Sequence, residues 1–174
     1  MIGMSTVSIG IRRAGTKDAA GVAAVHDDAW RQAYRGLIPG RELERMVNRR
    51  GATWWSTAIA NGLPILILEF DGAVAGYATF GRSRLGSLTH KGEIYELYLA
   101  PTHQGLGLGR RLFEAASAGL ARRSLVPHLV WALEANDGAC AFYERMGGKV
   151  VARGSERFGG EILPKIAFGY GEKD

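Results

Sequence analysis

The spacing of hydrophobic positions changes along the chain, and each change marks a new predicted element. Apolar and polar residues alternate over residues 7–13, which predicts a strand because successive side chains of a strand point to opposite faces. Residues 17–34 instead place alanine, tryptophan and tyrosine at helical spacing after Thr16, a suitable N-cap. A second helical region covers residues 41–61 and is broken at Gly51. The chain therefore opens with a strand followed by two helical segments.

A β-hairpin is predicted next. Two apolar runs, at residues 65–70 and 74–80, flank an Asp-Gly pair at residues 71–72, and this dipeptide favours the tight turns that join antiparallel strands. A polar loop then covers residues 81–91. Residues 93–100 return to an apolar pattern and predict a further strand.

The second half of the chain alternates helices and strands. Helices are predicted over residues 110–123 and 137–146, on either side of a short apolar strand at 128–133. Two more strands, at residues 149–155 and 163–170, are joined by a glycine-rich turn. An early hairpin followed by strand–helix–strand units predicts an α/β or α+β fold with a mixed sheet.

Composition narrows the functional classes. The net charge is +5 and the isoelectric point is about 9.6. The basic residues occur in scattered pairs interrupted by acidic residues, with no interleaved aromatic stripe, so a solvated basic surface is favoured over a nucleic-acid-binding face. A modest positive field would also suit a small phosphorylated ligand.

Signals for membranes, secretion and metals are weak throughout. Uninterrupted apolar runs, such as residues 65–68, are far shorter than the roughly 20 residues that cross a bilayer. Residues 1–10 lack the pattern of a signal peptide, so we expect a cytoplasmic protein without a membrane partner. The single cysteine, Cys140, rules out an intramolecular disulfide, and the four histidines share no ligand-like spacing, so we expect no metal. Cys140 itself is expected to be a small buried residue, not an acyl carrier.

Three alternating glycines, Gly105, Gly107 and Gly109, lie between a predicted strand and a predicted helix. Glycines let backbone N–H groups approach a ligand, and a helix N-terminus adds partial positive charge, so the segment favours an anionic phosphate. A flexible strand-to-helix loop is the alternative. The P-loop pattern fails because Gly109 is followed by Arg110-Arg111, and the dinucleotide fingerprint fails because Arg110 takes the place of its third glycine.

The pattern that does fit is Gln/Arg-x-x-Gly-x-Gly/Ala, which Gln104, Gly107 and Gly109 satisfy. About thirty residues later, Asn136 precedes a helix with a Phe-Tyr pair that ends at Tyr143. In these two motifs, taken in this order, the chain resembles the GNAT family of acetyl-CoA-dependent N-acetyltransferases.

The resemblance follows the order of elements over roughly residues 12–170. It implies a single N-acetyltransferase domain over residues 1–174, with a mixed, mostly antiparallel central sheet of about seven strands, a splayed fourth and fifth strand, and flanking helices. It also implies acetyl-CoA as co-substrate, with the pyrophosphate on the amides of the glycine loop and the pantetheine arm along the fourth strand. The cofactor-binding residues implied in this way are Leu97, Leu99, Gln104, Gly105, Leu106, Gly107, Leu108, Gly109, Arg110, Asn136 and Tyr143.

The chain departs from the family at two positions. Leu106 stands where the family often places a basic or polar residue, so one phosphate contact is in doubt. Gly147 is followed by Gly148 where an aromatic residue is common, which affects packing more than chemistry.

Acetyl transfer to an amine needs a base for the ammonium, stabilisation of the oxyanion, and a proton for the departing thiolate. Tyr143 is the candidate acid, although a packed helix tyrosine would have the same sequence signature. Glu93 is the candidate base by position in the family pattern. Glu96 competes with it, on the opposite strand face if pairing is regular, and a water chain is a third possibility. The backbone N–H of Leu97 is expected to face the oxyanion.

The resemblance implies an acceptor pocket built from residues 26–41, the fourth strand and residues 155–160. Trp30, Tyr34 and a pair of aspartates in the first helix resemble the corresponding stretch of polyamine-acetylating relatives and could hold a cation, or the aromatics could simply pack. The expected acceptor is a primary amine of a small molecule or peptide. The alternatives are a coenzyme A-binding regulator without catalysis and a basic nucleic-acid-binding module. A homodimer through residues 150–170 is also expected, as in many relatives.

Overall fold

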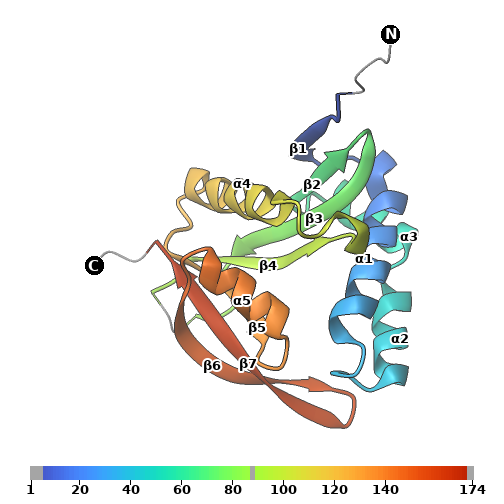
Figure 1. Ribbon diagram of the computed structural model, residues 1–174. Coiled ribbons are helices and arrows are strands. Elements are labelled where there is room, and N and C mark those ends of the chain that lie inside the picture. The colour runs from blue at the N-terminus through green and yellow to red at the C-terminus, as the bar shows by residue number, and fades with distance from the viewer. Residues whose placement is uncertain (1–5, 87–88, 172–174) are drawn as a thin grey trace.

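The computed structural model describes residues 6–86 and 89–171. These residues form one seven-stranded sheet in the order β1-β2-β3-β4-β5-β7-β6, flanked by five α-helices (Figure 1). The predicted fold class, a mixed and mostly antiparallel sheet of about seven strands, is confirmed. Within the described part of the chain, no helix is long and apolar enough to cross a membrane.

The first four strands form an antiparallel meander. β1 (Ile9–Arg13) pairs with β2 (Ile65–Phe70), which pairs with β3 (Ala73–Arg82), which pairs with β4 (Gly92–Leu99). The turn between β2 and β3 places Asp71 at φ 50° and Gly72 at φ 79°, the left-handed conformation that Asp-Gly tolerates in hairpin turns. The predicted hairpin is therefore confirmed. The predicted loop over residues 81–91 begins two residues later, because β3 extends to Arg82, and its residues 87 and 88 lie outside the described part.

The sheet opens between β4 and β5 (His128–Leu133). These strands run parallel and pair only through Gly92–His128, Glu93–Leu129 and Ile94–Val130. Beyond Ile94 the two strands separate, and β5 continues along β7 (Glu161–Tyr170) instead. The splayed pair of strands that the family resemblance implied is present.

The C-terminal hairpin is longer than the sequence predicts. β6 (Lys149–Phe158) runs three residues past the predicted end, and β7 begins two residues early, so the turn shrinks to residues 159–160. The sequence pattern missed this part because most of β6 is exposed to solvent. Residues 155–157 are polar and show no apolar alternation that would predict a strand. Backbone pairing with β7 alone defines this part of the strand.

The helices cover both faces of the meander. α1 (Ala19–Tyr34), α2 (Gly40–Arg49) and α3 (Ala52–Ala60) lie on one side, and α4 (Leu108–Arg122) on the other (Figure 1). Adjacent residues of β3 serve the two faces: Tyr77 packs in the core with α1 and α3, and Ala78 in the core with α4. α5 (Asp137–Arg145) follows β5 and lies beside the opening in the sheet.

Candidate active site

A cavity of about 620 Å³ lies where β4 leaves β5. Its walls come from the end of β4, the glycine loop, the start of α4, and α5. The lining residues are Gln32, Ala33, Leu97, Tyr98, Leu99, Gln104, Gly105, Gly107, Gly109, Arg110, Asn136, Gly138, Ala139, Phe142, Tyr143, Arg145 and Met146. Nine of the eleven predicted cofactor-binding residues are thus brought to one cavity.

The glycine loop reaches its shape through left-handed backbone conformations. Gly105 has φ 78° and Gly107 has φ 76°, and Gly107 is the N-cap residue of α4. Gly109 serves a different purpose: a Cβ atom there would lie 3.0 Å from Cε2 of Phe142, so this glycine lets α4 approach α5. Close packing therefore requires a glycine at position 109, which also lines the cavity.

The two remaining loop residues do not present side chains to this cavity. Leu108 is 2% exposed and packs in the main core, whereas Leu106 is 60% exposed. Any contribution they make to a ligand comes through the backbone, and their cofactor role stays a prediction. Gln104 ties the loop down, because its Nε2 donates to Oε1 of Gln32 at 2.8 Å and to the carbonyl of Leu99 at 3.4 Å.

Asn136 caps the helix that closes the cavity. Its Oδ1 accepts a hydrogen bond from the backbone N–H of Ala139 at 3.2 Å, at the start of α5. The oxygen is therefore engaged within the protein. The amide nitrogen of Asn136 is the group left to donate to a ligand in the cavity that this residue lines.

Tyr143 lies on the same cavity and is 6% exposed. Its ring packs among Phe113, Phe142 and Phe168, with centroid distances between 5.2 and 6.4 Å. Burial raises the pKa of Tyr143 well above its ordinary value, so the hydroxyl keeps its proton at neutral pH. A thiolate released into the same cavity would have its own pKa raised by the same burial, which helps it to take that proton.

A second cavity, of about 440 Å³, lies on the other side of Tyr98, which lines both. Its walls are aromatic and charged, and they come from α1, α2, β4, β5, the C-terminal hairpin and the loop after β3. The lining residues are Trp30, Tyr34, Met46, Arg50, Arg84, Leu85, Glu93, Tyr95, Glu96, Tyr98, Trp131, Ala132, Leu133, Glu156, Phe158 and Lys165.

A β-bulge brings both candidate bases to this second cavity. Thr79 pairs with Glu96, but its neighbour in β3 pairs with Ile94, so Tyr95 is an extra residue in β4. Regular pairing would have placed Glu93 and Glu96 on opposite faces of the strand. The pairing is not regular here, because the extra residue shifts the alternation by one, and both carboxylates line the same cavity.

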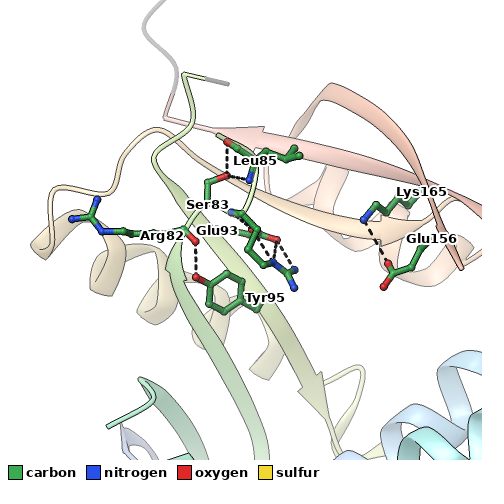
Figure 2. A network of polar contacts seen from close by, with 8 residues as sticks. Arg82, Ser83, Leu85, Glu93, Tyr95, Glu156 and Lys165 are labelled. Atoms are coloured by element: carbon green, nitrogen blue, oxygen red, sulfur yellow. Dashed lines mark hydrogen bonds and ion pairs between the residues drawn. The ribbon is translucent and has the colours of Figure 1, made fainter. Parts of the chain in front are cut away.

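Each of these carboxylates is held by an arginine. Glu93 is 1% exposed and accepts from the backbone N–H of Arg84 at 2.9 Å and from its guanidinium at 2.7 Å. Glu96 accepts from the hydroxyl of Tyr77 at 2.7 Å and from the guanidinium of Arg50. Figure 2 shows Glu93 and Tyr95 on β4, with a third ion pair, Lys165–Glu156 at 3.6 Å, on the C-terminal hairpin nearby.

Sequence reasoning missed the cations of this cavity. Arg50 ends α2, and its guanidinium carbon lies 4.7 Å from the ring centre of Trp54 and 5.8 Å from that of Trp30. Lys165 lies 4.6 Å from the ring centre of Trp131. Arg50 meets Glu96 and Trp30 from distant parts of the chain, whereas its contacts with Trp54 and Trp55 are local. That closeness in sequence was an available signal.

The first helix fulfils only part of its expected role. Trp30 and Tyr34 line the second cavity, but Asp27 and Asp28 do not, and Asp27 pairs with Arg31 on its own helix. The aspartates expected as a possible cation site are therefore not at the cavity. His26 is fully buried beneath it, and desolvation lowers its pKa to about 4, so the ring is neutral.

The surroundings of Cys140 do not favour a reactive thiol. Cys140 is half-buried in α5, its Sγ donates to the carbonyl of Leu133 at 3.5 Å, and burial raises the pKa of its thiol. A raised pKa leaves little reactive thiolate at neutral pH. Among residues 6–86 and 89–171, no group of three or more histidine, cysteine or acidic side chains is arranged to hold a metal ion.

Comparison with known proteins adds relatives along nearly the whole chain. The chain is 28% identical over 160 residues to the uncharacterized N-acetyltransferase YuaI of Bacillus subtilis, covering 92% of this chain and 91% of the relative. It is 35% identical over 103 residues to the L-amino acid N-acyltransferase MnaT of Escherichia coli, covering 59% and 57%. The spermidine N(1)-acetyltransferase of Thermoplasma acidophilum is 23% identical over 145 residues, covering 83% and 90%.

Solved structures share the fold. A GCN5-related N-acetyltransferase from Rhodopseudomonas palustris superposes with a TM-score of 0.74 at 21% identity, covering 96% of this chain and 98% of the other. The PaiA N-acetyltransferase of Thermoplasma acidophilum, solved in complex with coenzyme A, gives 0.70 at 18% identity, covering 91% and 98%. A family model described as the acetyltransferase (GNAT) family matches residues 22–148. Because that match spans more than two thirds of the chain, and the same fold recurs in these structures, the chain belongs to the GNAT family of acetyltransferases.

Proposed function

We propose that this chain transfers an acetyl group from acetyl-CoA to a primary amine of a small molecule or peptide. The observation that carries the proposal is the pair of cavities that share Tyr98 as a common wall. One has the glycine loop and a helix N-terminus, and the other has aromatic and charged walls. A thioester in the first cavity and an amine in the second would meet at this wall.

The first cavity fits a coenzyme A thioester. Backbone amides in left-handed loop conformations, followed by the N-terminus of a fifteen-residue helix, suit a pyrophosphate. Among the described residues, β4 has no partner on its β5 side beyond Ile94, so the backbone of Leu97 and Leu99 suits an extended amide-containing arm. When bound, acetyl-CoA would supply an activated acetyl group.

Tyr143 is the proposed general acid. It lines the first cavity, and its hydroxyl is protonated at neutral pH, so it has a proton to donate to a thiolate leaving group. An alkylammonium has a pKa near 10, about that of lysine, so the amine needs help to lose its proton. Glu93 is the proposed base, with Glu96 and a water chain as competitors, and the backbone N–H of Leu97 is proposed to face the oxyanion.

Two measurements separate this function from its alternatives. A calorimetric titration with acetyl-CoA distinguishes a GNAT-type protein from a basic nucleic-acid-binding module, which would bind DNA with steep salt dependence and ignore the coenzyme. A thiol-release assay over amines, polyamines, amino acids and peptides then tests catalysis. Binding without thiol release from any acceptor would favour the inactive regulator and overturn the proposed function.

A homodimer through the C-terminal strands stays a further proposal. Val150 on β6 and Ile162 on β7 are 46% and 57% exposed, so both strands present apolar side chains to solvent. Light scattering at micromolar concentration tests it, and a mass near 18.8 kDa would contradict it.

A further inference from the structure

The second cavity contains equal numbers of positive and negative side chains, joined in pairs. Its three carboxylates are bound to its three cations: Glu93 to Arg84, Glu96 to Arg50, and Glu156 to Lys165. A polyamine would bring two or more positive charges into this cavity and would have to displace a paired arginine or lysine. The balance of charge therefore favours an acceptor with no net charge.

The Arg50–Glu96 pair stands out among the three. Arg50 is 30% exposed and its guanidinium lies against the rings of Trp30, Trp54 and Trp55, which fixes its position. Glu93 accepts hydrogen bonds from two side-chain nitrogens of Arg84, which is 67% exposed. Glu96 accepts a hydrogen bond from only one nitrogen of Arg50, so further N–H donors of this half-buried guanidinium are left for a ligand.

We propose that the acceptor amine also carries a carboxylate, as an α-amino acid does, and that Arg50 binds this carboxylate. This inference rests on the proposed acetyl transfer and names its substrate class. In an α-amino acid the ammonium and carboxylate sit on one carbon, so the ligand presents adjacent opposite charges. The Arg50–Glu96 pair presents the complementary charges on the cavity wall, with the carboxylate ligand on Arg50 and the amine beside Glu96.

The position of this pair suits the reaction. Trp30 contacts Arg50 and also contacts Tyr98, with a ring-centre distance of 6.0 Å to the latter. Tyr98 is the wall between the two cavities. An amine next to Glu96 would therefore be held near this wall, while Trp131, Phe158 and Met46 offer apolar surface for a side chain.

The test compares acceptors that differ only at the carboxylate. L-phenylalanine, L-phenylalaninamide and phenethylamine form one set, and L-leucine, L-leucinamide and isoamylamine a second, with spermidine and a tripeptide as references. The readout is kcat/KM from thiol release with saturating acetyl-CoA. The free acids should exceed both the amides and the decarboxylated amines by about 10- to 100-fold, the strength of a charge-assisted bidentate contact.

The Arg50→Gln variant tests the residue. Its acid-to-amide ratio should fall towards one through a raised KM for the acid, and spermidine should improve because Glu96 loses its counter-ion. Arg50→Lys should keep part of the ratio, since the charge remains without the planar fork. Arg49→Gln is the matched control: it removes the same charge from an exposed position next in the chain and should leave the ratio unchanged. Acetyl-CoA affinity, measured on each variant, reports that the fold is intact.

The possible results distinguish the carboxylate inference from the proposed acetyl transfer. Amines turned over without preference for the free acid, or a wild-type preference that survives in Arg50→Gln, would overturn the carboxylate inference and leave acetyl transfer standing. No turnover of any acceptor would overturn the proposed function and this inference with it. A preference for the free acid that disappears only in Arg50→Gln is the expected result.

Discussion

The hydroxyl groups of Tyr34 and Tyr98 lie 2.5 Å apart and form a hydrogen bond between α1 and β4. Burial raises the pKa of Tyr34 to about 12 and the pKa of Tyr98 well above its ordinary value, so both hydroxyls are neutral at pH 7. Tyr98 separates the two cavities, and Tyr34 lines only the second. This hydrogen bond therefore fixes the position of the common wall against the first helix.

A double-mutant cycle tests the bond. Tyr34→Phe and Tyr98→Phe should each lower the free energy of unfolding by about 0.5–1.5 kcal/mol, because each leaves a buried hydroxyl without its partner. The double variant should lose less than the sum, since it leaves no orphan. Urea unfolding measures all three, and strictly additive losses would mean that the two hydroxyls do not interact.

The glycine loop gives a prediction about coenzyme affinity. Gly107→Val should weaken acetyl-CoA binding, because a branched side chain at the start of α4 covers the amides and disfavours φ 76°. Gly62→Val is the matched control, with φ 85° and equally open surroundings, but in the loop before β2. Calorimetry should show a loss of affinity only for Gly107→Val, and equal affinities would remove the loop from the binding site.

Tyr143→Phe should lower kcat by about 10²- to 10⁴-fold, the usual contribution of a general acid, with acetyl-CoA affinity nearly unchanged. The ring contacts with Phe113 and Phe142 do not involve the hydroxyl and should persist. Tyr170→Phe is the comparison: it removes a hydroxyl that donates to the backbone carbonyl of Tyr143 at 2.7 Å. That variant should lose stability more than turnover, and a wild-type rate for Tyr143→Phe would end its assignment as the acid.

The two candidate bases, Glu93 and Glu96, can be distinguished by the pH dependence of the rate. If Glu93 is the base, Glu93→Gln lowers the rate most at neutral pH, and the deficit shrinks as pH rises and more amine is already neutral. Glu96→Gln should then raise KM for the acceptor more than it lowers kcat. A pH-dependent deficit in Glu96→Gln alone would transfer the role of base to Glu96, and flat profiles for both would favour a water chain.

Two buried histidines predict acid sensitivity. Desolvation lowers the pKa of His26 and of His128 to about 4, from 6.5 in an unfolded chain. Between these values the unfolded state binds more protons, so the free energy of unfolding falls as pH drops from 6.5 towards 4. His128→Gln, which removes one of these groups, should lose less stability between pH 7 and pH 5 than the wild type. Urea midpoints at the two pH values measure this, and identical losses would contradict it.

Short-range patterns were sufficient for most elements and for the first cavity. The glycine loop and the hairpin turn at residues 71–72 each depend on residues close in sequence, whose backbone preferences are set locally. The predicted N-cap at Thr16 is wrong, because Thr16 begins a short 3-10 helix (Thr16–Asp18) and α1 starts only at Ala19, after Asp18. Because the glycine loop directly follows β4, the sequence could place Gln104 beside the strand that carries Leu97. The exposed part of β6 was missed because its boundary depends on pairing with β7 and no local apolar pattern marks it.

The residues that line the second cavity could be identified only from the tertiary structure. The bulge at Tyr95 is a mismatch between two paired strands, so no pattern within β4 reveals it, yet it decides that Glu93 and Glu96 face the same space. Arg50 and Glu96 lie 46 residues apart and meet because α2 packs on α1, which packs on β4. The sequence by itself therefore determined the family motifs and the glycine loop, whose geometry is local. Folding decided which charges line the second cavity, because sheet register and helix packing bring together residues that have no relationship along the chain.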